Sequence, residues 1–177
     1  ALCGGHGSVI DEVGTPVVDN RFTVPIDPDK IKITLLFQNT FINSTVMYKT
    51  AVLKELNGYN DYAPAEDYEL FIRISDKYPV GNLDSILVKY RIHGSNTSII
   101  QSELGRIKVR SIKEKQLTKL QINPDKKLTD AFFSILEWDY NAPNFTDYLS
   151  LFTKLKAANR SLNKYPEIPF EKMLFNY

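Results

Sequence analysis

Two adjacent carboxylic acids, Glu66 and Asp67, open a segment whose apolar side chains recur at helical spacing. In the first turn of a helix, the helix dipole and free backbone N–H groups favour an ionised carboxylate by about 0.3–1 kcal/mol per exposed charge. Asp67 is therefore expected to be a ready proton acceptor. Acids that only stabilise a helix take the same position, so local placement leaves both interpretations open.

The side chains that could form one reactive site lie in three segments of the sequence. They are Asn43–Tyr48, Gly58–Leu70 and Tyr90–Asn96. The first is rich in hydroxyl groups, the second contains the carboxylates, and the third contains Arg91 and His93. A single site requires a fold that brings the three segments together.

The elements expected to position these segments alternate between short strands and short helices up to about residue 100. Strands are expected at Gly4–Ile10 and Pro16–Val18, joined by a turn at Val13–Thr15, because β-branched residues flank turn-forming ones. A helix is expected over residues 28–37, since proline is favoured at the first helical position. Ser44–Tyr48 is expected to be a strand.

Two further helices and one strand surround the carboxylates. Thr50 is expected to cap a helix that Gly58 ends in a left-handed conformation. The helix of the carboxylates has Pro64 in its first turn, and Ile86–Arg91 is short and β-branched enough to be a buried strand. From there the pattern is helical, with helices expected over residues 101–120, from Pro124 onward, and over about 145–162.

Composition narrows the class of protein. The 177 residues can bury roughly 70% of the surface that the unfolded chain exposes. The formal net charge of +1 is far from that of a dedicated nucleic-acid binder, so no nucleic-acid partner is expected. The single cysteine, Cys3, cannot form an internal disulfide, which fits a reducing cytoplasm. The sequence contains no apolar run long enough for a membrane span, and its first residues lack the pattern of a signal peptide, so a soluble chain is expected.

The order of the three segments resembles the second half of family-2 nucleotide-sugar glycosyltransferases, whose fold is called GT-A. In that family a strand and helix like Ser44–Tyr59 lead to an acidic pair, here Glu66–Asp67, and later to a Tyr-Arg-x-His-Gly ending, here Tyr90–Gly94. The similarity covers roughly residues 5–100. It implies an α/β fold with a partial GT-A-type mixed sheet and helices in residues 1–100, the acceptor-side part of the core. An all-helical C-terminal extension in residues 101–177 is expected to follow.

The resemblance also implies roles for individual residues. Asp67 would take the proton from an acceptor hydroxyl as that oxygen attacks the anomeric carbon of a nucleotide-activated sugar, with inversion. Glu66 would be the second member of the catalytic pair. A general base of this kind contributes about 10²–10⁴-fold to the rate. The acceptor-binding side chains are expected to be Tyr59, Asp61 and Arg91.

A divalent cation, Mn²⁺ or Mg²⁺, is implied as cofactor of the complete enzyme, because it can stabilise the nucleoside diphosphate leaving group as a Lewis acid. In the general pattern of the fold, a histidine just after the last core strand helps to hold the metal. His93 lies at that place. A hydrogen-bonded structural histidine in a loop is the alternative, and it stays open.

The donor half of the family pattern is the main departure. That half supplies a β-α-β nucleotide-binding unit and an Asp-x-Asp, and here the one Asp-x-Asp spacing, Asp27–Asp29, has just 26 residues before it. We interpret it as a helix start and expect the 177-residue chain alone to be inactive. The complete enzyme would act on a nucleotide-sugar donor and a glycan or lipid-linked acceptor in polysaccharide biosynthesis. The alternative is a non-catalytic glycan-binding or oligomer-interface module.

A cytoplasmic location is expected. The basic residues of the helix over 106–119 leave open a peripheral contact with the inner face of the membrane, although such charges more often form a solvated face. A homo-oligomer is left open as well.

Overall fold

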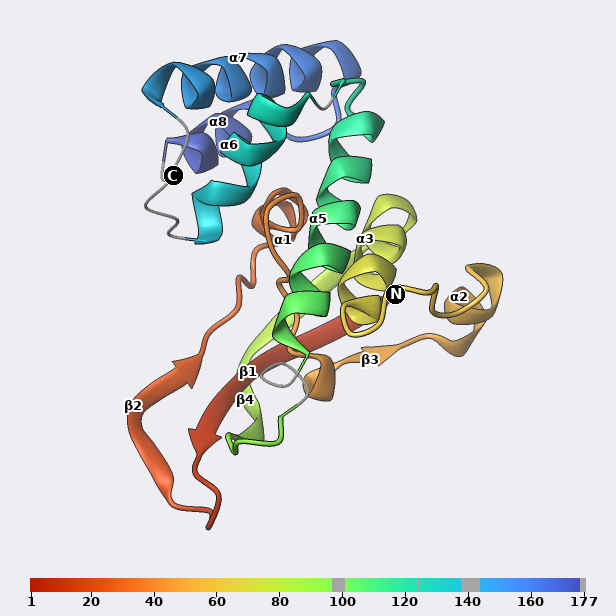
Figure 1. Ribbon diagram of the computed structural model, residues 1–177. Helices are drawn as coiled ribbons and strands as arrows, with labels where there is room; N and C mark the ends of the chain where they lie inside the picture. The colour runs from red at the N-terminus through yellow and green to blue at the C-terminus, as the bar shows by residue number, and fades with distance from the viewer. Residues whose placement is uncertain (97–100, 124, 138–143, 176–177) are drawn as a thin grey trace. The chain divides into compact units, whose positions relative to one another are not determined.

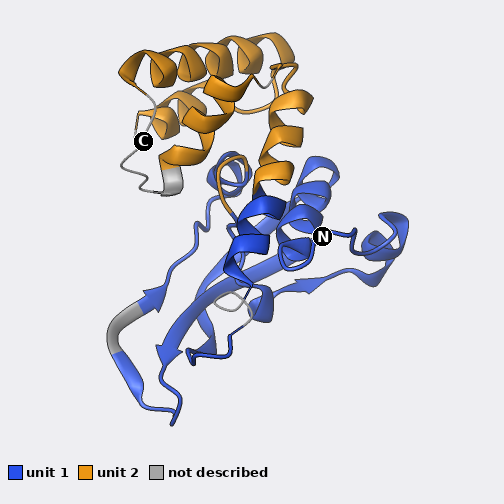
Figure 2. Ribbon diagram, in the orientation of Figure 1, with its two compact units in different colours: residues 1–35, 39–109 blue, residues 36–38, 110–177 orange. Residues whose placement is uncertain are grey.

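The computed structural model describes residues 1–96, 101–123, 125–137 and 144–175. They form two compact units, one of residues 1–35 with 39–109 and one of residues 36–38 with 110–177 (Figure 2). The first unit is mixed α/β and the second is built of helices, which confirms the predicted fold class. Helix α5 (Ser102–Lys119) contributes residues to both units. The division into functional parts at residue 100 stays a prediction.

The sheet of the first unit is organised around β1 (Leu2–Ile10) (Figure 1). β4 (Val80–Arg91) runs parallel to β1 over the whole length of β1. β2 (Pro16–Phe22) and β3 (Met47–Tyr48) pair antiparallel with the end and the start of β1, so they share its other edge. The β1–β2 hairpin is as predicted.

Helix α1 (Pro28–Thr34) begins where the sequence predicts. The Asp27 side chain accepts a hydrogen bond of 2.8 Å from the backbone N–H of Lys30, so Asp27 caps the helix and confirms the interpretation of Asp27–Asp29 as a helix start. The helix ends at Thr34, short of the predicted end at residue 37.

The segment predicted as the strand Ser44–Tyr48 is only partly a strand. It begins with a 3₁₀ turn, η1 (Asn43–Thr45), before β3. The Thr45 hydroxyl donates to the carbonyl of Ile42 at 2.8 Å and accepts from the backbone N–H of Gly5 at 3.1 Å. A side chain that bonds to nearby backbone in this way favours a turn over an extended strand.

Helices α2 (Thr50–Glu55) and α3 (Glu66–Lys77) precede β4. Thr50 is the first residue of α2 rather than its cap, because Lys49 occupies the N-cap position without a side-chain hydrogen bond. Gly58 follows α2 with a φ of 66°, the predicted left-handed conformation.

The prediction of a buried strand at Ile86–Arg91 was wrong about burial and about the start of the strand. β4 begins at Val80, and Leu83, Ile86 and Leu87 expose 52%, 47% and 43% of their surfaces. The register against β1 shifts twice around these residues. Consecutive apolar residues are typical of a strand inside a sheet that is covered on both faces. Among the described strands, β4 pairs with β1 alone, so it lies at the edge of the sheet, where its register is irregular.

The second unit contains the C-terminal part of α5, then α6 (Lys126–Glu137), α7 (Phe145–Leu162) and α8 (Glu167–Leu174). The predicted bounds of α5 and α7 are confirmed, while α8 was not predicted and Pro124 lies outside the described residues. Large apolar side chains form the core of this unit, among them Phe132, Leu155 and Phe170. Within the described part of the chain, every helix is too short or too polar to cross a lipid bilayer.

Candidate functional site

Asp67 is the second residue of α3, and its carboxylate is held at both oxygens. Oδ1 accepts from the backbone N–H of Tyr68 at 2.6 Å, and Oδ2 accepts from Nδ2 of Asn39 at 3.3 Å. Burial raises the pKa of the half-buried Asp67 carboxyl and the charge of Glu66 adds to the rise, although the two hydrogen bonds oppose it. A fixed carboxylate with an increased proton affinity is suited to act as a base.

Glu66, the first residue of α3, differs from its neighbour in its hydrogen bonds. Its Oε2 atom is buried and has no hydrogen-bond partner among the described residues. A buried acceptor without a donor is unfavourable by about 1–3 kcal/mol or more. The two acids also favour the helix start, so the structural interpretation of the pair stays open.

Tyr59 lies close to both acids and is paired with a second phenol. Its hydroxyl is 3.0 Å from that of Tyr48 on β3, and 46% of the residue is exposed. The hydrogen bond with Tyr48, burial, and the negative charges of Asp67 and Glu66 raise the pKa of Tyr59 to about 12. The Tyr59 hydroxyl therefore stays protonated at physiological pH. Sequence reasoning missed Tyr48 as a site residue, although it ends one of the three segments.

Arg73 holds the loop that carries Tyr59. Its two terminal nitrogens donate to the carbonyls of Leu56 and Gly58, both at 2.6 Å. Its Nε donates to both carboxylate oxygens of Glu69 at 2.9 and 2.8 Å, and the side chains of Arg73 and Glu69 are largely buried. The third turn of α3 thus fixes the backbone immediately before Tyr59. Arg73 was not among the predicted site residues.

Two of the predicted acceptor-binding residues have other partners. The Asp61 side chain is fully exposed and 3.9 Å from Nζ of Lys108. Arg91, at the end of β4, donates from Nη1 to the carbonyls of Asp11 at 3.0 Å and Glu12 at 2.7 Å, which fixes the β1–β2 turn. Neither residue makes a described contact with the acids of α3, so their acceptor-binding roles stay predictions.

His93 belongs to a turn that follows β4. Its backbone N–H donates to the Asn96 side chain at 2.6 Å, and its Nδ1 is 2.7 Å from the Ser95 hydroxyl. If Nδ1 donates to Ser95, the lone pair of Nε2 is free for a metal ion. The described residues contain no group of three or more histidine, cysteine or acidic side chains that could hold a metal ion. They therefore do not form a complete cation site, and His93 could supply one ligand.

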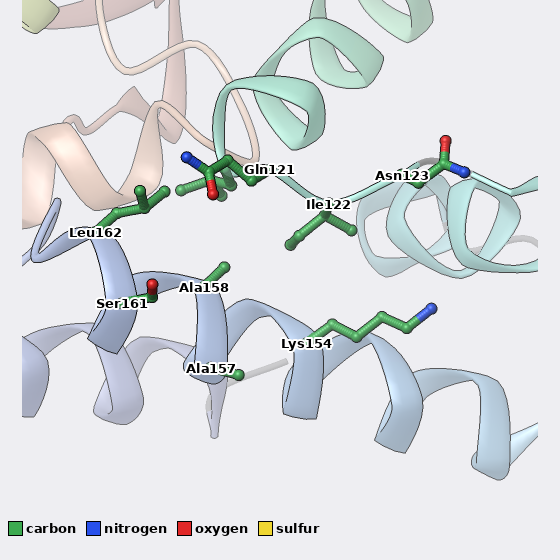
Figure 3. Close-up of a pocket in the computed structure, with 9 residues that line it drawn as sticks. Gln121, Ile122, Asn123, Lys154, Ala157, Ala158, Ser161 and Leu162 are labelled. Carbon is green, nitrogen blue, oxygen red and sulfur yellow. The ribbon is translucent and has the colours of Figure 1, made fainter.

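The described cavity does not coincide with these residues. It has a volume of about 490 Å³ in the second unit and lies between residues 120–123 and one face of α7, with Lys154, Ala158 and Ser161 among its lining residues (Figure 3). None of the predicted site residues lines it. The candidate site is thus defined by the side chains around the start of α3.

The chain is similar to glycosyltransferases over part of its length. It is 38% identical over 72 residues to the O-antigen biosynthesis glycosyltransferase WbnJ of Escherichia coli, a match that covers 39% of this chain and 28% of that protein. It is 33% identical over 86 residues to an uncharacterised glycosyltransferase of Haemophilus influenzae, covering 48% of this chain and 27% of that protein. The chain thus spans less than a third of the length of these curated relatives. No family model matches the chain, and no solved structure matches it.

Proposed function

We propose that this chain provides the acceptor side of a family-2 glycosyltransferase with the GT-A fold, in which Asp67 is the general base. The observation that supports the proposal best is the environment of Asp67, a half-buried carboxylate with a raised pKa, held by two donors beside Glu66 and a pair of phenols. The names of the two relatives support sugar transfer in general.

In this reaction the Asp67 carboxylate removes the proton from an acceptor hydroxyl. The resulting oxygen nucleophile forms a bond to the anomeric carbon of a nucleotide sugar from the side opposite the leaving group, which inverts that carbon. The bond to the nucleoside diphosphate breaks, and the diphosphate leaves with the electron pair. The Tyr59 hydroxyl, on a residue that is 46% exposed, donates a hydrogen bond to another hydroxyl of the acceptor, and Glu66 is the second member of the acidic pair.

A divalent cation remains part of the proposal for the complete protein. His93 would offer Nε2 as one ligand, and the other ligands would come from outside the described residues. When bound, such a cation supplies Lewis-acid stabilisation of the diphosphate. No role of the residues around Asp67 depends on it.

The partners and location follow from the same reasoning. WbnJ is named for O-antigen biosynthesis, and for this chain we propose a glycan or lipid-linked acceptor in polysaccharide biosynthesis. We place the protein in the cytoplasm, where nucleotide sugars are made available. Peripheral membrane contact and a homo-oligomer remain open in this proposal.

The test is Asp67→Asn in the full-length protein that contains this chain. We expect kcat to fall by about 10²–10⁴-fold with little change in donor affinity, because the substitution removes the basic site and keeps the size of the side chain. Asp76→Asn is the matched control, since Asp76 is an exposed acid on the same helix. Nearly normal turnover of Asp67→Asn would contradict the proposal and favour the non-catalytic glycan-binding module.

A further inference from the structure

Asn39 lies in the segment between α1 and η1 and is the described side chain that donates a hydrogen bond to the Asp67 carboxylate. We infer that Asn39 is the positioning residue for Asp67, holding Oδ2 so that a free lone pair faces the acceptor hydroxyl. The inference rests on the proposed function of Asp67 as the base. It adds a residue that neither the sequence pattern nor the resemblance singled out.

The orientation of the Asn39 amide is fixed by a second hydrogen bond. Its Oδ1 accepts from the backbone N–H of Phe41 at 3.1 Å. Because an amide has one acceptor oxygen and one donor nitrogen, its NH₂ group must then face Oδ2 of Asp67, as observed at 3.3 Å. The opposite orientation would place two oxygens against each other and leave the N–H of Phe41 without its acceptor.

Helix α3 holds the backbone on both sides of Asn39. Before Asn39, the Tyr68 hydroxyl donates to the carbonyl of Leu35 at 2.8 Å. After Asn39, the Phe41 ring packs edge-on against that of Phe71, with the centroids 5.2 Å apart. Tyr68 and Phe71 are one and four residues beyond Asp67 on α3. The same helix therefore carries Asp67 and the side chains that hold the chain around Asn39.

A third anchor comes from the sheet. The side chain of Asn82 on β4 donates to the carbonyl of Thr40 at 3.1 Å, and Thr40 is almost completely buried. The chain around Asn39 is thus held by α3 at Leu35 and Phe41 and by β4 at Thr40. Fixing a catalytic group to within about 0.5 Å is what supporting hydrogen bonds achieve in active sites.

Burial and the neighbouring charge of Glu66 both favour the neutral form of Asp67. Burial raises the pKa of Asp67, and so does the charge of Glu66 beside it on α3. The phenol of Tyr59 also lies near Asp67, and it carries no positive charge. Among the side chains, Asn39 contributes the hydrogen bond that lowers the pKa of Asp67. Its amide therefore favours the ionised form of the base, in the same direction as the backbone N–H of Tyr68, and also places the carboxylate.

The direct test is an NMR titration of the Asp67 carboxyl carbon in the 177-residue chain, with the signal assigned from Asp67→Asn. Asn39→Asp keeps the acceptor for the N–H of Phe41 but replaces the donor with a second carboxylate. Asn39→Ala removes both functions. We expect both variants to raise the pH at which Asp67 titrates, with the upper titration step of Asn39→Asp shifted by about one pH unit or more.

Asn60→Asp is the matched control for added charge. Asn60 donates to Oε1 of Glu69 at 3.0 Å, so this variant also sets a new carboxylate against an acid of α3. We expect Asp67 to titrate nearly as in the wild type. An unchanged titration of Asp67 in both Asn39 variants, or an equal shift in Asn60→Asp, would overturn the inference.

Kinetics of the full-length protein separate this inference from the proposed function. Because the ionised base is the active form, raising its pKa moves the acid limb of kcat/KM upward, and Asn39→Ala should recover rate as the pH rises. A merely structural loss would lower kcat/KM equally at every pH. If Asp67→Asn is inactive but the acid limb stays in place in the Asn39 variants, only the Asn39 inference fails. If Asp67→Asn turns over normally, both the proposed role of Asp67 as the base and the inference about Asn39 are wrong.

Discussion

Glu66 and Asp67 are neighbours in sequence, but their surroundings suit them to different tasks. Asp67 has a donor on each oxygen, and burial raises its pKa. Glu66 has one buried oxygen to which none of the described residues donates. Paired carboxylates divide their roles through such differences in environment, as in many acid–base sites. In our proposal Asp67 therefore moves the proton, while Glu66 acts through its charge, which raises the pKa of Asp67.

Tyr59→Phe tests the acceptor side of the site. The substitution keeps the ring and removes a hydroxyl that stays protonated at physiological pH. We expect the KM for the acceptor to rise about 3–10-fold in the full-length protein, since a hydrogen bond contributes about 1 kcal/mol, with little change in the KM for the donor.

Tyr90→Phe is the matched control, because Tyr90 lies on β4 with its ring against Phe22. Its acceptor KM should match that of the wild type. An equal rise in both variants, or no rise in Tyr59→Phe, would remove Tyr59 from the acceptor site.

His93→Ala tests the metal ligand in the full-length protein. If Nε2 binds a divalent cation, the metal concentration for half-maximal rate should rise, and Ser95→Ala should act in the same direction with a smaller effect. The reason is that Ser95 orients the ring through Nδ1.

A structural role for His93 predicts a different pattern. The metal titration would then match that of the wild type after scaling, and the melting temperature would fall. The ring hydrogen bond is exposed, whereas Asn96 bonds to the backbone at both His93 and Arg91. We therefore expect Asn96→Ala to lower stability more than His93→Ala does.

At the scale of elements, the features with a local physical cause were predictable from sequence. Asp27 and Pro28 start α1, Gly58 takes a left-handed conformation after α2, and α7 spans the predicted residues after the Asn144 cap. The 3₁₀ turn at Asn43–Thr45 was missed because its cause lies partly in a hydrogen bond to a distant strand. The exposure of β4 was missed since apolar runs do not reveal which edges are paired.

The candidate site was predictable only for the residues that begin α3. Glu66 and Asp67 are adjacent, and their position in the first turn can be read from the helical pattern. Asn39, Tyr48 and Arg73 act through partners that are 28, 11 and up to 17 residues away in sequence. No periodicity connects such pairs, because they meet through tertiary packing.

Arg73→Lys tests how far α3 determines the loop that carries Tyr59. Lysine keeps the charge but lacks the planar fork that reaches Glu69 and two carbonyls at once. We expect the free energy of unfolding to fall by about 1–3 kcal/mol, measured by urea denaturation.

Arg160→Lys is the control, because Arg160 also bonds two acids, Glu167 and Glu171, but is 59% exposed. Its effect should stay within about 0.5–1 kcal/mol. Equal losses in the two variants would show that burial of Arg73 adds nothing to the stability of the loop.

At the scale of the whole molecule, the division of the chain into two compact units predicts that each unit unfolds separately. Leu155→Ala removes a fully buried side chain from the second unit and should destabilise it by about 2–5 kcal/mol. Hydrogen exchange should accelerate in α7 and stay unchanged in β1. Ile74→Ala, in the core of the first unit, should give the reverse pattern. Equal acceleration of both units in either variant would mean that the chain unfolds as one cooperative body.

The exposed run on β4 has a consequence for how the chain behaves in concentrated solution. A long strand with an unpaired edge and exposed apolar side chains is a template for edge-to-edge association. Leu83, Ile86 and Leu87 form such a run, and the described strands leave their outer edge without a partner. Asp84 is the one charged residue between Leu83 and Leu87, and its side chain is 79% exposed. We expect this carboxylate, together with the register shifts of β4, to oppose such association.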